Sequence, residues 1–169
     1  MKKKSSLINF VFSGFLTFCN LETSLSGETT ADFVASATLS SSCSISASTM
    51  TFASYTGAAI DATSDITVNC TYNTDFTTSI ADTPDGGDSV SYKLVRYGTD
   101  GSASGNYLLV TLKKNNNSGA QMTSGAATFT GTGSGSGASI GAIYGAIASG
   151  QTNRAPGTFS KVFTLNIVY

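Results

Sequence analysis

The sequence predicts an all-β domain, an immunoglobulin-like sandwich of two sheets, and three observations support that prediction. Apolar side chains recur at every second position in most segments, which is the period of a strand with one buried face. Turn signals separate these segments, and the clearest is TPDGGD at residues 83–88. No segment combines a sustained 3.6-residue period with helix caps. Many short strands between turns are typical of a β-sandwich.

The first 26 residues have the pattern of a signal peptide, with cleavage expected after Ser26. Three lysines at residues 2–4 precede an apolar stretch at residues 7–18, which is shorter than the ~20 residues that a membrane span needs. An interfacial anchor helix is the alternative. A lipid anchor on Cys19 is disfavoured by the bulky residue before it. We therefore expect export from the cytoplasm.

The chain after the leader is poor in charge and mildly acidic. Charged residues are 11% of the sequence, against about 25% in typical domains. Taking Glu22 from the ten acids and the three leader lysines from the nine bases leaves nine acids and six bases, a net charge of −3. This composition fits an extracellular β protein and argues against nucleic-acid binding.

Two cysteines, Cys43 and Cys70, remain after the leader. An even pair in an exported chain predicts a disulfide, and two free buried thiols are the alternative. The bond would close the loop of residues 43–70 and stabilise the fold by on the order of 3 kcal/mol.

The alternation also places the expected strands. They occupy residues 31–39, 44–52, 64–72, 76–80, 89–97, 107–112 and 161–169. In the third of these, Ile66, Val68, Cys70 and Tyr72 are expected on one face. The run at 107–112 is apolar throughout, so it is buried on both faces or has no assignable inward face. GTGSGSG at 131–137 is interpreted as a loop within a single domain.

The sequence lacks the residues on which most catalytic mechanisms depend. The sequence contains no His, which removes the usual general base and the commonest zinc ligand. Asp61 and Asp65 are the candidate pair for glycoside hydrolysis, but no aromatic platform lies near them. Asp82, Asp85 and Asp88 could gather around calcium, although their spacing does not match a calcium loop and hairpin turns favour Asp. We expect no enzymatic activity, catalytic residue, metal or cofactor.

Four segments share a recognisable pattern. They are CSISASTMTFASY (43–55), ITVNCTYNTDFTTSI (66–80), IYGAIASGQ (143–151) and APGTFSKVFTLNIVY (155–169). The pattern resembles the spore coat protein U domain family, which includes secreted subunits of archaic, Csu-type chaperone–usher pili. Residue 53 is Ala where the family pattern has Gly, and residues 81–130 match poorly, so the strand order there is not predicted.

The resemblance implies a sandwich that lacks one strand and exposes a hydrophobic groove. A periplasmic chaperone would fill this groove first, and a neighbouring subunit would replace it at an outer-membrane usher. Residues 27–40 would be the donor-strand extension and residues 41–169 the pilin-like domain. The chain would pass through the periplasm to a surface fibre serving cell adhesion or biofilm formation.

The resemblance also assigns residues to the two halves of the contact. The donor strand would insert Phe33, Ala35, Ala37 and Leu39. The acceptor groove would include the C-terminal strand, with Phe163, Leu165, Ile167 and Tyr169. An alternating segment can pair with any open edge, and Phe33 and Leu39 would contribute most of its apolar burial.

One alternative remains beside this interpretation. Residues 31–39 could form the first strand of their own domain. The protein would then be a self-complete secreted or spore-coat sandwich that binds a ligand through its loops.

Overall fold

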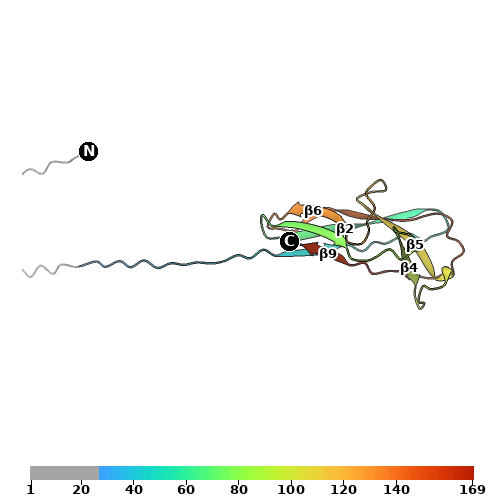
Figure 1. Ribbon diagram of the computed structural model, residues 1–169, viewed down its shortest axis with the longest axis horizontal. Coiled ribbons are helices and arrows are strands. Elements are labelled where there is room, and N and C mark those ends of the chain that lie inside the picture. Colours follow the sequence, from blue (N-terminus) through green and yellow to red (C-terminus); the bar gives the residue numbers. More distant parts are fainter. Residues whose placement is uncertain (1–26) are drawn as a thin grey trace, which may run out of the picture. The chain divides into compact units, whose positions relative to one another are not determined.

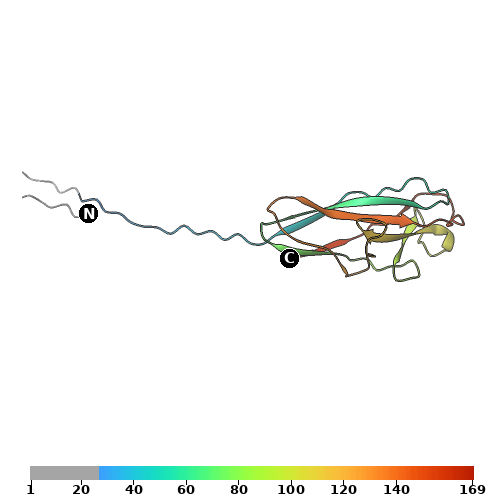
Figure 2. The same ribbon diagram turned by 90° about the horizontal axis from the view of Figure 1, so that it is seen from above.

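The computed structural model describes residues 27–169, so the predicted signal peptide at residues 1–26 lies outside the described residues. The chain divides into two units, Met1–Ala37 and Thr38–Tyr169. The second unit is built of strands in two layers (Figures 1 and 2). In the described part the only helix is the three-residue 3-10 turn η1 (Ser104–Asn106). No helix among residues 27–169 has the length and apolar character to cross a membrane.

Six strands form the larger sheet and three form the smaller one. The larger sheet has the order β1 (Cys43–Ala47), β2 (Ile60–Cys70), β7 (Ala138–Ile147), β5 (Tyr107–Lys114), β4 (Ser91–Arg96) and β8 (Phe159–Ser160). The smaller sheet has the order β6 (Ala127–Thr132), β3 (Asp75–Ile80) and β9 (Leu165–Val168). Every pairing between these strands is antiparallel. The all-β sandwich predicted from the sequence is confirmed.

The core lies between the two layers, and alternation builds it. In β5 the residues Leu108, Val110 and Leu112 are buried, while their neighbours on the other face are half-buried. The apolar run at residues 107–112 therefore sends alternate side chains into the core. Tyr92 from β4 and Ile80 from β3 are fully buried in the same cluster, so residues from both sheets form one core.

Several strand boundaries differ from the sequence prediction. The strand expected at residues 44–52 ends at Ala47, and residues 48–59 then run without regular structure. The strand expected at 64–72 begins at Ile60 and ends at Cys70. Tyr72 is 79% exposed, not inward-facing, because the chain turns at Asn73, which adopts a positive φ of 59°.

Three strands, β6, β7 and the two-residue β8, were not predicted. Glycines obscure the alternation of β6 and β7, although Ile143, Gly145 and Ile147 of β7 are all buried on one face. The loop predicted at 131–137 begins later, because β6 extends to Thr132. In a sequence, a glycine suggests a loop. Where the inner surface of a sheet is crowded, however, a residue without a side chain is the one that fits.

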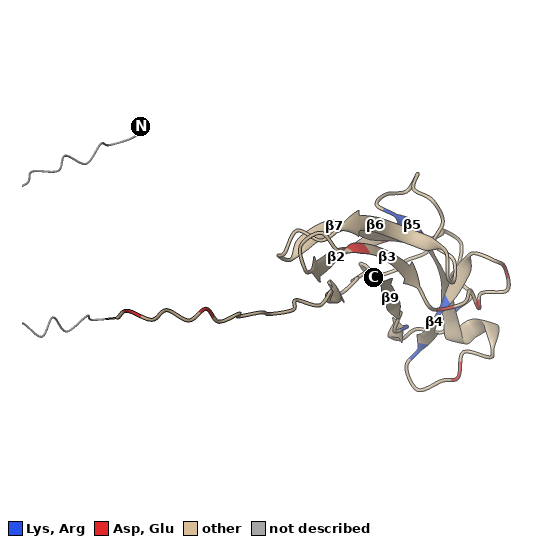
Figure 3. Ribbon diagram, turned by 60° about the vertical axis from the view of Figure 1, so that its left-hand side comes forward, with Lys and Arg blue, Asp and Glu red and all other residues tan. Residues whose placement is uncertain are grey.

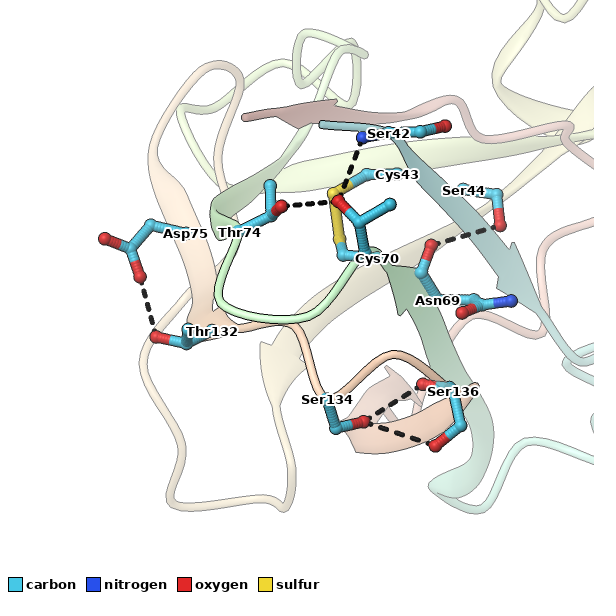
Figure 4. The surroundings of a disulfide bond; sticks show 11 residues. Ser42, Cys43, Ser44, Asn69, Cys70, Thr74, Asp75, Thr132, Ser134 and Ser136 are labelled. Atoms are coloured by element: carbon cyan, nitrogen blue, oxygen red, sulfur yellow. Dashed lines mark hydrogen bonds between the residues drawn. A yellow bond between two sulfur atoms is a disulfide. The ribbon is translucent and has the colours of Figure 1, made fainter. Parts of the chain in front are cut away.

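The cysteine pair is bonded across neighbouring strands of one sheet. Cys43 lies directly opposite Cys70 in the β1–β2 register, and their sulfur atoms form a disulfide (Figure 4). Beside it, the Ser42 N–H donates to Thr71 Oγ1 at 3.2 Å, and the Thr71 N–H donates to the Ser42 carbonyl at 2.9 Å. These contacts fix the point at which β1 begins.

Candidate strand-binding groove

A groove with an apolar floor lies between two segments of the Thr38–Tyr169 unit that do not pair with each other. Residues 47–57 form its first wall and residues 154–165 form its second wall. Apolar side chains of the larger sheet line its floor: Ile60, Leu94, Leu108, Leu112, Ile143 and Ile147. The groove has two hollows. The strand-side hollow, of about 500 Å³, reaches Leu165, and the loop-side hollow, of about 750 Å³, reaches Arg154.

The main chain along both walls has open edges. On the first wall, β1 pairs with β2 only as far as Ala47, and the last bond between main-chain groups joins the Ser48 N–H to the Asp65 carbonyl at 3.0 Å. On the second wall, β8 pairs only with β4 and β9 only with β3 among the described residues. An extended peptide between the walls would meet unpaired N–H and C=O groups on either side.

The second wall contains two of the four residues that the sequence analysis assigned to the C-terminal strand. Phe163 and Leu165 line the strand-side hollow, and Phe163 packs edge-on against Tyr92 with ring centroids 5.2 Å apart. Ile167 does not line the hollows; it packs against the cluster formed by Val68, Cys70 and Phe76. Tyr169 is 56% exposed. Their role in strand binding remains a prediction.

The first wall contributes residues that the sequence analysis did not assign to the groove. Met50 and Phe52 line both hollows, and their side chains pack on the core. They cover Gly145 of β7: a Cβ atom there would overlap Met50 Sδ and lie 2.9 Å from Phe52 Cζ. The alternation of Met50 and Phe52 is visible in the sequence. Only the packing shows that they enter the groove without joining a strand.

The predicted donor residues have no sheet partner in the structure. Residues 27–42 form no strand, and Phe33, Ala35, Ala37 and Leu39 are all exposed. Phe33 is 89% and Leu39 is 85% exposed, which is unusual for such large apolar side chains. The structure thus places residues 31–39 in no strand of their own domain. Their role as a donor remains a prediction.

The acidic residues near the turn at residues 83–88 hold the second wall. Asp85 Oδ2 accepts a charged hydrogen bond from Lys161 Nζ at 2.8 Å, and Asp82 Oδ2 accepts the Thr164 N–H at 2.7 Å. Acidic and basic residues accordingly lie side by side around β4 (Figure 3). Asp88 instead closes its own turn by accepting the Val90 and Ser91 N–H groups at 2.8 and 2.6 Å.

These contacts shift the ionisation of the carboxyl groups. Partial burial works against ionisation of Asp85, but the hydrogen bonds from Lys161 and from the Lys93 N–H outweigh it and lower its pKa. The Val90 N–H, together with the Ser91 hydroxyl and N–H, lowers the pKa of Asp88. In residues 27–169 no group of three or more His, Cys, Asp or Glu side chains could hold a metal ion.

The candidate carboxylate pair, Asp61 and Asp65, lies on the exposed face of β2. Two residues four apart on a strand are separated by about 13 Å, whereas glycoside hydrolysis needs carboxyl groups within about 10 Å. The backbone spacing does not support that reaction.

Together these features define a β-sandwich whose two sheets leave an apolar groove between unpaired strand edges. The chain belongs to the Spore Coat Protein U domain family, whose model matches residues 29–166. The family resemblance drawn from the four sequence segments is therefore confirmed. No curated protein matches the chain.

Among solved structures, the chain is similar to one in the crystal structure of the CsuC–CsuE chaperone–tip adhesion subunit pre-assembly complex from archaic chaperone–usher Csu pili of Acinetobacter baumannii. The sequence identity is 18% and the TM-score is 0.48. The match covers 78% of this chain but only 40% of the other chain.

Proposed function

We propose that this protein is a structural subunit of a secreted surface fibre, a chaperone–usher pilus assembled by donor-strand exchange. The single observation that carries the proposal is that one chain holds both halves of a strand contact. One half is the open apolar groove, and the other is the exposed alternating segment at residues 31–39. Membership of the Spore Coat Protein U domain family supports the same role.

Strand addition explains how two such halves would bind. Main-chain hydrogen bonds to the open edges supply affinity, and alternate side chains entering the groove supply register. A contact between the extension of one copy and the groove of the next is head-to-tail and does not close, so it generates a filament. The presence of a donor extension favours a shaft subunit over a tip subunit.

The proposal also names partners and a location. An apolar groove exposed before assembly is an aggregation hazard, so a periplasmic chaperone would cover it until an outer-membrane usher joins the subunits. The Cys43–Cys70 disulfide supports passage through an oxidising compartment. The assembled fibre would lie outside the cell and serve attachment or biofilm formation.

A direct test compares the full-length protein, expressed into the periplasm with its own leader, with a variant lacking residues 28–40. Size-exclusion chromatography and negative-stain microscopy measure assembly, and circular dichroism measures folding. We expect linear polymers from the full-length protein. The variant should stay unpolymerised and folded, and should bind an added peptide of residues 28–40. A full-length protein that stays monomeric and never binds the peptide would overturn the proposal.

One observation favours a self-complete binding module as the second candidate. Leu112 and Ile147 on the groove floor are only 1% and 2% exposed without any donor strand. A domain with a covered core could stand alone and bind a ligand through its loops. In the same experiment, a stable monomer that does not exchange strands would favour this candidate.

A further inference from the structure

The proposed donor segment has an uneven set of inward side chains. Phe33 and Leu39 are large and stand at its ends, whereas Ala35 and Ala37 are small and stand in the middle. A groove of uniform depth would leave empty space over the two alanines. Such voids cost stability, because the atoms that line them lose their packing partners. A good fit therefore requires a groove that is shallow in the middle and deep at both ends.

The groove has two hollows, and its own chain crowds the level between them. Along β7, Ile143 lines the strand-side hollow, Ile147 lines the loop-side hollow, and Gly145 lies between these two residues. Ala62 of β2 and Gly145 of β7 are paired neighbours. Their side chains are only a methyl group and a hydrogen atom, so they leave space above the sheet at this position. Met50 and Phe52 fill the space: their tips crowd the position of a Gly145 Cβ atom. We call Met50 and Phe52 the plug.

The plug lies where the two hollows meet. Met50 and Phe52 line both hollows, as do Leu94 of the floor and Phe159 of the second wall, whereas Phe163 and Leu165 line only the strand-side hollow and Arg154 only the loop-side hollow. The plug residues pack on the buried core but remain half-exposed themselves. They therefore present an apolar surface to any strand that enters the groove.

We propose that this plug sets the register of the donor strand. Building on the proposed function, the occupant is residues 28–40 of a second copy of this chain. Ala35 and Ala37 lie over the plug, and Phe33 and Leu39 each fill one hollow. Met50 and Phe52 thereby act as specificity-determining residues, which admit a donor with small central residues and reject one with large central residues.

The spacing agrees with this register. Phe33 and Leu39 are six residues apart, which is about 20 Å in a strand. Along the second wall, the strand-side hollow takes residues 159–165 and the loop-side hollow takes residues 154–159. On the floor, Leu112 of the strand-side hollow and Leu108 of the loop-side hollow are four residues apart in β5, or about 13 Å, so two side chains about 20 Å apart straddle these two floor positions. One large side chain therefore reaches each hollow when the alanines lie over the plug.

The test uses the full-length chain, in which donor and groove can be changed together. Ala35→Leu with Ala37→Leu places large side chains over the plug and leaves the domain untouched. We expect the rate of polymer dissociation in denaturant to rise at least tenfold. Met50→Ala added to this pair removes part of the plug, and we expect it to restore the rate to within about threefold of the unmodified chain. Val34→Leu, which changes an outward-facing donor position, is the matched control and should leave the rate unchanged.

Three results separate the outcomes. If enlarging Ala35 and Ala37 strengthens the polymer, or if Met50→Ala weakens it further instead of rescuing it, the plug does not set the register. In both cases the unmodified chain still polymerises through residues 28–40, so the proposed function stands. If the unmodified chain does not polymerise, both proposals fail. Near-UV circular dichroism of the Met50→Ala chain confirms folding, and the Ala35→Leu, Ala37→Leu result decides the point without any change in the domain.

Discussion

Two segments of this chain carry the same strand pattern and have different outcomes. Residues 31–39 and residues 161–169 both alternate apolar and polar side chains. The second segment forms β9, pairs with β3 and packs Phe163 against Tyr92. The first forms no strand, and its side chains are exposed. Alternation therefore indicates that a segment is suited to a sheet. Whether it joins one depends on an open strand edge to pair with and an apolar surface to pack against.

The difference follows from what each segment can bury. Ordering a segment costs backbone conformational entropy, and the burial of large apolar side chains offsets part of that cost. Residues 161–169 have three such side chains in the fold, at Phe163, Leu165 and Ile167. Residues 31–39 have only two among their inward positions. They gain enough free energy to form a strand only where a preformed groove also supplies hydrogen-bond partners for the main chain.

The largest effect is expected at the bond that fixes the start of the domain. Replacing both Cys43 and Cys70 by Ala releases the constraint on a sequence separation of 27 residues. We expect a loss of on the order of 3 kcal/mol in the free energy of unfolding. Urea denaturation of the oxidised protein and of the double variant measures it. Equal midpoints would show that the disulfide adds nothing to the folded domain.

A somewhat smaller effect should distinguish the folded alternating segment. Phe163→Ala removes the ring that packs on Tyr92 and lines the strand-side hollow. Because Phe163 is only half-buried, we expect about 2–3 kcal/mol of destabilisation, below the usual range for a fully buried Phe. Val162→Ala is the matched control, since Val162 is 88% exposed. A control loss as large as the Phe163 loss would contradict this packing argument.

The matching change in the exposed segment should leave the domain as stable as before. Phe33→Ala removes no contact within the folded domain, so its unfolding free energy should change by less than about 0.5 kcal/mol. The association constant for polymer assembly should fall at least tenfold, which corresponds to a loss of about 1.4 kcal/mol in the free energy of association. Thermal unfolding and quantitative size-exclusion chromatography measure the two quantities. Val34→Ala serves as control, and an equal loss of assembly there would argue against alternate insertion.

The smallest effect concerns the ion pair that holds the second wall. Because the pKa of Asp85 is lower in the folded domain than its ordinary value of 3.8, its contribution is present above that value and is lost as the pH falls through the folded pKa. The pair is partly exposed, so we expect less than about 1 kcal/mol. Asp85→Asn should destabilise the protein at pH 7, and the difference should shrink as the pH falls below 3.8 and through the lowered pKa of Asp85. A pH-independent difference would exclude this electrostatic origin.

Part of the groove could be predicted from the sequence and part could not. The alternation of residues 161–169 predicted that Phe163 and Leu165 share a face, and in the structure both side chains pack on the core and line the strand-side hollow, while their role in strand binding stays a prediction. It also assigned Tyr169 to the same face, but β9 ends at Val168 and Tyr169 is largely exposed. The sequence analysis placed Met50 and Phe52 at the end of an expected strand. Alternation predicts which way side chains point, but it does not predict the residue at which a strand stops pairing with its neighbour.

By itself the sequence determined the all-β class, the family, the cysteine pair and the two alternating segments, because these depend on local period, composition and short motifs. Only the tertiary structure decided the order of the strands, the turn that exposes Tyr72 and the packing of Met50 and Phe52 over Gly145. These depend on contacts between residues far apart in the chain. A glycine that suggests a loop in the sequence can lie within a strand of the fold, where its missing side chain leaves space for another residue.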